Sequence, residues 1–179
     1  MTPLEFQQRG LLDLIKGRAT TPQDPYLRRI EGSRELAMIR EIAIWWRTFQ
    51  LRVQCHFTSR LLERLHCFDT LVAAYFDKNP TSTFVEELSQ GFLEVLKGHH
   101  DGLVRAVAQF ESAWLLIRTG DTGKFEVLWD RHPDRVFLAL ENGTELPPAE
   151  SECAYCIRMA QDLPQMFHCI RESRISTRL

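Results

Sequence analysis

Apolar residues recur at three- and four-residue steps through residues 1–118. The clearest case is the stretch 83–118, where this pattern predicts two amphipathic helices, 84–96 and 103–118, joined by a turn around Gly98-His99-His100. The same spacing predicts further helices over residues 3–16, 25–30, 33–57, 58–65 and 68–76. We therefore expect the chain to be helical throughout residues 1–118.

The long helix predicted over residues 33–57 is apolar on more than one side. One face carries an apolar series from Leu36 to Val53, whereas Ile44 and Trp45 lie off that face. Such a pattern is typical of a central helix in a bundle, and it also suits a surface that binds a partner.

The pattern changes after the turn-forming segment 119–123. Residues 125–129, 152–159 and 166–171 favour strands, and the corner at residues 162–164 favours antiparallel pairing. Residues 133–140 fit either a short strand or a short helix, because Pro133 suits a first turn and Gly143 a C-terminal cap. We predict an α+β fold with a helical bundle at residues 1–119. A small winged-helix-like α/β region with a short antiparallel sheet follows at 120–179.

Composition narrows the classes of function. The 179 residues carry a formal net charge of -2 and no evident basic cluster, which disfavours binding to nucleic acid. The first residues lack the features of a signal peptide, and the apolar runs are too short to cross a membrane. Five cysteines, an odd number, suggest reduced thiols and a cytoplasmic location.

Several candidate chemical groups stand out, but none forms a familiar active-site motif. Cys153 and Cys156 have the spacing of a thiol or zinc pair, yet residues three apart in a strand face opposite sides. Glu111 lies in an apolar run, where pairing with Arg105 or Arg118 is the simplest expectation. We therefore expect no catalytic residue, metal or cofactor in this chain, with a zinc or thiol site at the cysteine pair as an alternative.

A short sheet leaves unpaired N–H and C=O groups at its edge, and an extended peptide can add there as a further strand. On residues 152–159, alternate side chains such as Tyr155, Ile157 and Met159, or the opposite set, would contact such a peptide. The alternative is a sheet that simply packs on the helices.

Four segments resemble a known family: LVAAYFDKNPTSTFVEELSQGFLEVLKG, VAQFESAWLL, VLWDRHPDRVFLALENGTELP and DLPQMFHCIRES. Together they cover roughly residues 65–174 and are similar to the small partner proteins of TIM-barrel multinuclear iron enzymes. Those enzymes modify cysteine in ribosomally made peptides. Within the family, the chain most resembles the partner subunit of the 3-thiaglutamate pathway, in which the β-carbon of a C-terminal cysteine is excised.

The resemblance implies a heterodimer in which the barrel enzyme holds the iron and this chain holds the carrier peptide. We expect the peptide to contact the two C-terminal strands through Glu152, Tyr155, Ile157, Met159, Phe167, Cys169 and Arg171. We expect Trp45, Trp114 and Trp129, where exposed, to dock the barrel enzyme. The alternative function is a winged-helix DNA-binding regulator.

Overall fold

The computed structural model describes residues 2–17, 24–79, 84–150 and 153–173. The chain divides into two compact units, Met1–Gln50 and Leu51–Leu179. Helices dominate, and a small antiparallel sheet lies near the C-terminal end, so the expected α+β class is confirmed.

The first unit contains α1 (Pro3–Ile15), α2 (Pro25–Glu31) and most of α3 (Arg34–Gln54). Thr2 and Glu5 form a capping box at the start of α1, and Asp24 caps α2. A small core of Leu14, Leu27 and Leu36 joins the three helices.

The second unit contains five helices and three strands in its described residues. The helices are α4 (His56–Arg64), α5 (Phe68–Lys78), α6 (Val85–Leu96), α7 (Gly102–Arg118) and α8 (Pro133–Asn142). The strands are β1 (Phe125–Trp129), β2 (Cys153–Met159) and β3 (Phe167–Ser173), with the short 3-10 turn η1 (Pro164–Met166) before β3. The sheet order is β1-β2-β3, and both pairings are antiparallel.

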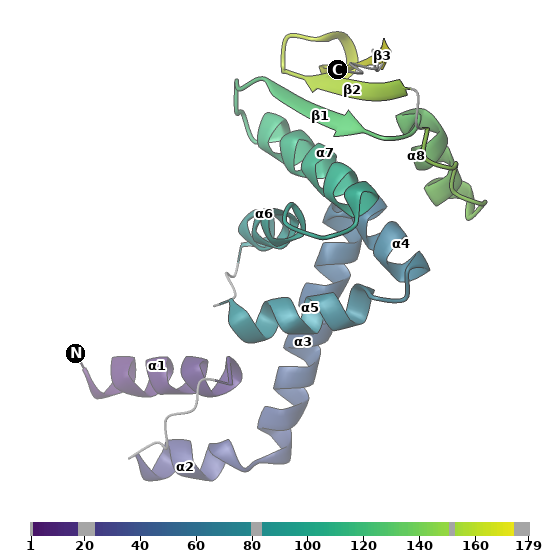
Figure 1. Ribbon diagram of the computed structural model, residues 1–179. Helices are drawn as coiled ribbons and strands as arrows, with labels where there is room; N and C mark the ends of the chain where they lie inside the picture. The colour runs from purple at the N-terminus through teal and green to yellow at the C-terminus, as the bar shows by residue number, and fades with distance from the viewer. Residues whose placement is uncertain (1, 18–23, 80–83, 151–152, 174–179) are drawn as a thin grey trace, which may run out of the picture. The chain divides into compact units, whose positions relative to one another are not determined.

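The predicted pair α6–α7 forms the centre of this unit. The described strands lie along α7, which packs against α6 and α4 as well (Figure 1). One continuous core therefore runs from Leu88 and Phe92 on α6, through Val107 on α7, to Ile157 in the sheet. The domain boundary expected near Gly120 is wrong, because α7 is buried by helices and sheet together. The turn-rich segment marks a change of secondary structure, whereas the structure divides at Gln50–Leu51.

The structure corrects the predicted position of one helix break and decides the conformation of residues 133–140. The break between the third and fourth helices falls at Cys55, where φ is -107° and ψ is 58°, and not after Phe57. The ambiguous segment at residues 133–140 is helix α8, which ends at Gly143 in the left-handed region with φ of 67°. Arg60 on α4 donates to the Leu140 and Glu141 carbonyls at the end of α8, at 3.1 and 2.9 Å.

Candidate functional site

The sheet turns an apolar face towards the helices. In this face lie Val127 and Trp129 of β1 and Tyr155, Ile157 and Met159 of β2, all at most 5% exposed. Because β2 is the central strand, β1 and β3 occupy its backbone groups on both sides. The prediction that Tyr155, Ile157 and Met159 contact a peptide is therefore wrong: their side chains fill the core and their strand has no open edge. Glu152 lies outside the described residues.

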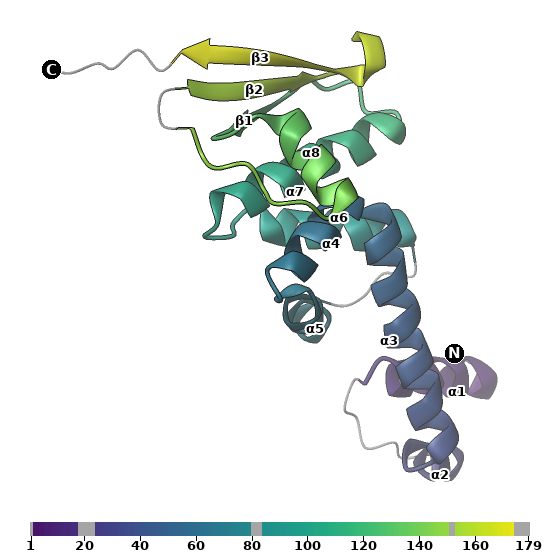
Figure 2. The same cartoon turned by 90° about the vertical axis from the view of Figure 1, so that its right-hand side faces the viewer.

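β3 is the edge strand next to β2, and the side of β3 away from β2 is open in the described residues (Figure 2). Phe167, Cys169 and Arg171 lie opposite Met159, Ile157 and Tyr155 and so share their face. Phe167 and Cys169 are partly buried, whereas Arg171 is exposed. Of the predicted peptide contacts, these three therefore lie on a strand that a peptide can reach.

One hydrogen bond just before the first residue of β3 shows which backbone groups of β3 bond to β2. The Ala160 N–H donates to the Met166 carbonyl at 3.1 Å, one step past the Met159–Phe167 pair. In an antiparallel ladder, bonded and non-bonded pairs alternate. His168 and Ile170 are therefore bonded to β2, and the backbone groups of Phe167 and Cys169 point away from it. In the described part of the chain, no other strand pairs with them.

The end of this edge is polar. The Tyr155 hydroxyl donates to the Glu150 carboxylate at 2.9 Å, and the Arg171 guanidinium lies 4.0 Å from the same carboxylate. The guanidinium carbon of Arg171 also lies 5.9 Å from the centre of the Tyr155 ring. Arg171 is thus held near the edge by a carboxylate and an aromatic ring.

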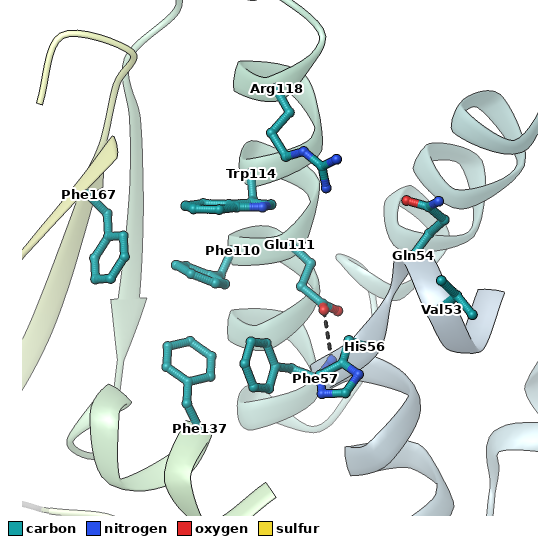
Figure 3. A pocket seen from close by; sticks show the side chains of 10 residues that line it. All are labelled: Val53, Gln54, His56, Phe57, Phe110, Glu111, Trp114, Arg118, Phe137 and Phe167. Atoms are coloured by element: carbon teal, nitrogen blue, oxygen red, sulfur yellow. Dashed lines mark hydrogen bonds between the residues drawn. The ribbon is translucent and has the colours of Figure 1, made fainter. Parts of the chain in front are cut away.

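A pocket of about 360 Å³ opens beside the start of β3. Its walls are aromatic: the Phe110 ring lies 4.7 Å from that of Phe137 and 5.9 Å from that of Phe167, and Trp114 stacks on Phe110 (Figure 3). The remaining lining residues are Val53, Gln54, His56, Phe57, Glu111 and Arg118. Phe167 is the residue that the described strands contribute, so the pocket lies on the β3 side of the sheet.

Glu111 is the buried polar group of this pocket. One carboxylate oxygen accepts the Phe57 backbone N–H at 2.7 Å (Figure 3). The other accepts the Thr58 backbone N–H at 2.8 Å. Phe57 and Thr58 are the second and third residues of α4, and the preceding Cys55 provides no side-chain cap. Glu111 therefore caps α4 from another helix. The expected pairing with Arg105 or Arg118 is wrong, since Arg105 donates to the His99 and His100 carbonyls and no ion pair joins Glu111 to either arginine.

Burial raises the pKa of Glu111 to about 7, because the protein interior disfavours the charged carboxylate. The backbone N–H groups at the start of α4 act in the opposite direction, since they stabilise the ionised form. Glu111 consequently changes charge near neutral pH while it lies 5% exposed. The structure assigns it a capping role, and among the described residues no second carboxylate and no serine, threonine or cysteine lines the pocket with it.

The three tryptophans expected to dock a partner lie in different environments. Trp45 is 62% exposed, Trp114 lines the pocket, and Trp129 is 2% exposed in the core. Trp129 is therefore removed from the expected partner surface. Trp45 belongs to a larger exposed set, here called the α3 apolar surface: Met38, Ile39, Ile42, Ile44, Trp45, Trp46 and Phe49. Within it, Trp45 and Trp46 each stack on Phe49 with ring centres 5.8 Å apart.

The other candidate groups do not assemble into a site in the described residues. No cluster of three or more His, Cys, Asp or Glu suited to a metal ion is found there. Cys156 is buried, and the side chain of Cys153 lies outside the described part. His99 accepts the Asp101 N–H at 3.2 Å within the α6–α7 turn, which gives it a structural role.

The region between β1 and β2 bears on the DNA-binding alternative. Its described residues form a single helix, α8, whose charged residues are Asp134, Arg135 and Glu141. A recognition helix in a major groove normally presents several basic or amide side chains. Nothing in α8 favours duplex binding.

No described helix combines the length and the apolar composition that a membrane crossing requires. Comparisons with protein-family models, with curated proteins and with solved structures find no match to this chain.

Proposed function

We propose that this chain is the accessory, peptide-binding subunit of an iron-dependent enzyme that modifies a cysteine on a ribosomally made carrier peptide. The reaction we propose for the partner is excision of the cysteine β-carbon, as in 3-thiaglutamate biosynthesis. The observation that carries the proposal is the β3 edge, where the Phe167 and Cys169 backbone groups point away from β2 beside an aromatic pocket. An added strand receives its affinity from such groups and its specificity from neighbouring pockets.

The α3 apolar surface supports the second part of the proposal, which is a partner protein. Exposed aromatic clusters of this kind mark protein interfaces, and tryptophan is enriched among the residues that dominate binding energy. We assign this surface to the iron-containing enzyme. The peptide edge and the partner surface then lie on separate units of the chain.

Co-purification followed by reconstitution tests this function. The tagged chain is isolated from its native cells, the co-purifying protein is identified, and the iron of the complex is measured. The proposal expects an iron-loaded partner at equal stoichiometry. The complex, mixed with dioxygen and a short peptide that ends in cysteine, should break the Cα–Cβ and Cβ–S bonds of that residue and join its sulfur to Cα. Dioxygen is the oxidant, and the β-carbon should leave as formic acid. Each protein alone should leave the peptide unchanged.

Two results would contradict the proposal. One is a chain that emerges alone and binds no cysteine-containing carrier peptide. The other is tight binding to duplex DNA at physiological salt, with the steep salt dependence expected of phosphate contacts. The second result would favour the regulator.

A further inference from the structure

We propose that the pocket beside β3 holds an apolar side chain of the bound peptide and that Arg118 pairs with a carboxylate next to that side chain. This inference rests on the proposed peptide-binding function and names the chemistry that the peptide must have.

The position of Phe167 connects the edge to the pocket. An added strand lies about 4.8 Å from β3, and directly opposite side chains lie on the same face with Cβ atoms about 5 Å apart. A peptide residue opposite Phe167 therefore directs its side chain to the helical side of the sheet. Phe167 itself lines the pocket there, and its ring lies 5.9 Å from Phe110 and 6.4 Å from Trp114.

The lining selects an apolar group. Phe57, Phe110, Trp114 and Phe137 line the pocket together with Phe167, and the Phe57 and Phe137 rings lie 4.6 Å apart. The volume of about 360 Å³ is at the lower end of the range for small ligand sites. An aromatic or branched aliphatic side chain fits such a space and is bound by loss of its contact with water.

The charged residues in the lining restrict further which kind of peptide residue can bind in the pocket. Glu111 is the acid in the lining, and both its oxygens are occupied by the α4 backbone N–H groups at 2.7 and 2.8 Å. Arg118 is exposed, lines the same pocket, and makes no ion pair in the described residues. Arg118 thus has no ion-pair partner in the described residues, and the Glu111 oxygens are directed at the start of α4. A peptide carboxylate beside the apolar side chain complements this arrangement.

A fragment titration tests the pocket separately from the edge. The ¹⁵N-labelled full chain is titrated with N-acetyl-L-phenylalanine, which carries a ring and a carboxylate, and with its uncharged amide. We expect NMR shifts at the Phe57 and Thr58 amides and at the Trp114 indole, with the acid binding about two- to fivefold more tightly than the amide. Arg118→Glu should abolish that preference, whereas Lys124→Glu, an equal charge change at another exposed site, should keep it.

Binding of the carrier peptide to variants of the chain then tests the pocket inference separately from the proposed function. Val53→Trp enlarges an exposed residue at the pocket mouth, while Val53→Thr preserves its size. We expect Val53→Trp to weaken peptide binding at least about tenfold and Val53→Thr to leave it nearly unchanged. Arg118→Glu should weaken it about two- to fivefold.

Failure of the pocket inference and failure of the proposed function would give different results. If Cys169→Pro or N-methylation of the peptide abolishes binding while Val53→Trp does not, the pocket inference is overturned and strand addition stands. If the fragments shift the pocket signals but no carrier peptide binds, the proposed function fails, and the peptide occupant of the pocket fails with it. If the fragments leave Phe57, Thr58 and Trp114 unshifted, the pocket does not have the assigned chemistry.

Discussion

The Glu111 carboxylate accepts the Thr58 backbone N–H at 2.8 Å, although the two residues are 53 positions apart in the chain. This bond fixes the start of α4 to the middle of α7 and so sets one wall of the apolar pocket. A helix whose preceding residue cannot cap it obtains its cap from a neighbouring helix. The relationship has a measurable dependence on pH.

Glu111→Gln should remove a specific pH dependence of stability. The folded-state pKa of Glu111 is raised from 4.5 to about 7, so between these values the folded chain retains a proton that the unfolded chain releases. Its stabilising contribution is fully present below about pH 4.5 and is lost as pH rises to about 7. The parent should therefore lose up to about 3 kcal/mol of unfolding free energy relative to Glu111→Gln over this window.

Urea denaturation at a series of pH values measures this difference, with Glu86→Gln on the exposed surface of α6 as the matched control. A parent-to-variant difference that stays constant from pH 4.5 to 8 would show that Glu111 does not titrate as described.

The hydrogen-bond phase of β3 predicts unequal effects of proline at adjacent positions. Ile170→Pro removes an N–H that bonds to β2, whereas Cys169→Pro removes one that points away from it. We expect Ile170→Pro to lower the unfolding free energy by about 1–3 kcal/mol more than Cys169→Pro. Equal effects, or the reverse order, would mean that the phase of the ladder is the opposite one.

The α3 apolar surface predicts a localised loss of partner binding. Trp45→Ala should weaken binding to the iron-containing partner at least about thirtyfold, since large exposed aromatic residues dominate such interfaces. Leu128→Ala removes an equally exposed apolar side chain from β1 and should have little effect. Calorimetry with the purified partner measures both. Binding that survives Trp45→Ala unchanged would remove α3 from the interface.

Close packing between α5 and α6 predicts a steric effect. A Cβ at Gly91 would collide with the Tyr75 hydroxyl, which donates to the Leu88 carbonyl at 3.3 Å. Gly91→Ala should therefore destabilise the fold by about 1–3 kcal/mol. In a Tyr75→Phe background the same substitution should cost less, because the colliding oxygen is gone. An additive double-mutant cycle would exclude this contact as the cause.

The sequence predicted most elements because local chemistry determines them. The apolar spacing between Leu88 and Trp114 specified α6 and α7, and Pro133 and Gly143 are the residues that decide in favour of a helix at α8. The strands were recognisable from short apolar runs. The α+β class followed from these local signals.

The order of the strands is not encoded locally. Residues 152–159 read as a strand suited to an edge, but β2 pairs on both sides, and Tyr155, Cys156 and Ile157 are buried in succession. Consecutive burial of apolar residues on both faces is the signal that indicates a central strand. This signal indicates that residues 152–159 form a central strand, and it favours β3 as the strand that contacts the peptide.

The pocket was missed for a similar reason. Its lining comes from α3, α4, α7, α8 and β3, so no single segment reveals it. Phe110, Phe137 and Arg118 look like ordinary core or surface residues in the sequence. Glu111 was noticeable as a carboxylate in an apolar run, but its partner is the backbone of a remote helix, which a sequence pattern cannot show.

Amide hydrogen exchange along β3, measured by NMR with and without the carrier peptide, tests strand addition most directly. In the free chain, we expect the Phe167 and Cys169 amides to exchange quickly and the His168 and Ile170 amides to be protected. Addition of the peptide should slow exchange at Phe167 and Cys169 while the other two remain protected. A peptide that binds tightly but leaves the exchange of Phe167 and Cys169 unchanged would contradict recognition at this edge.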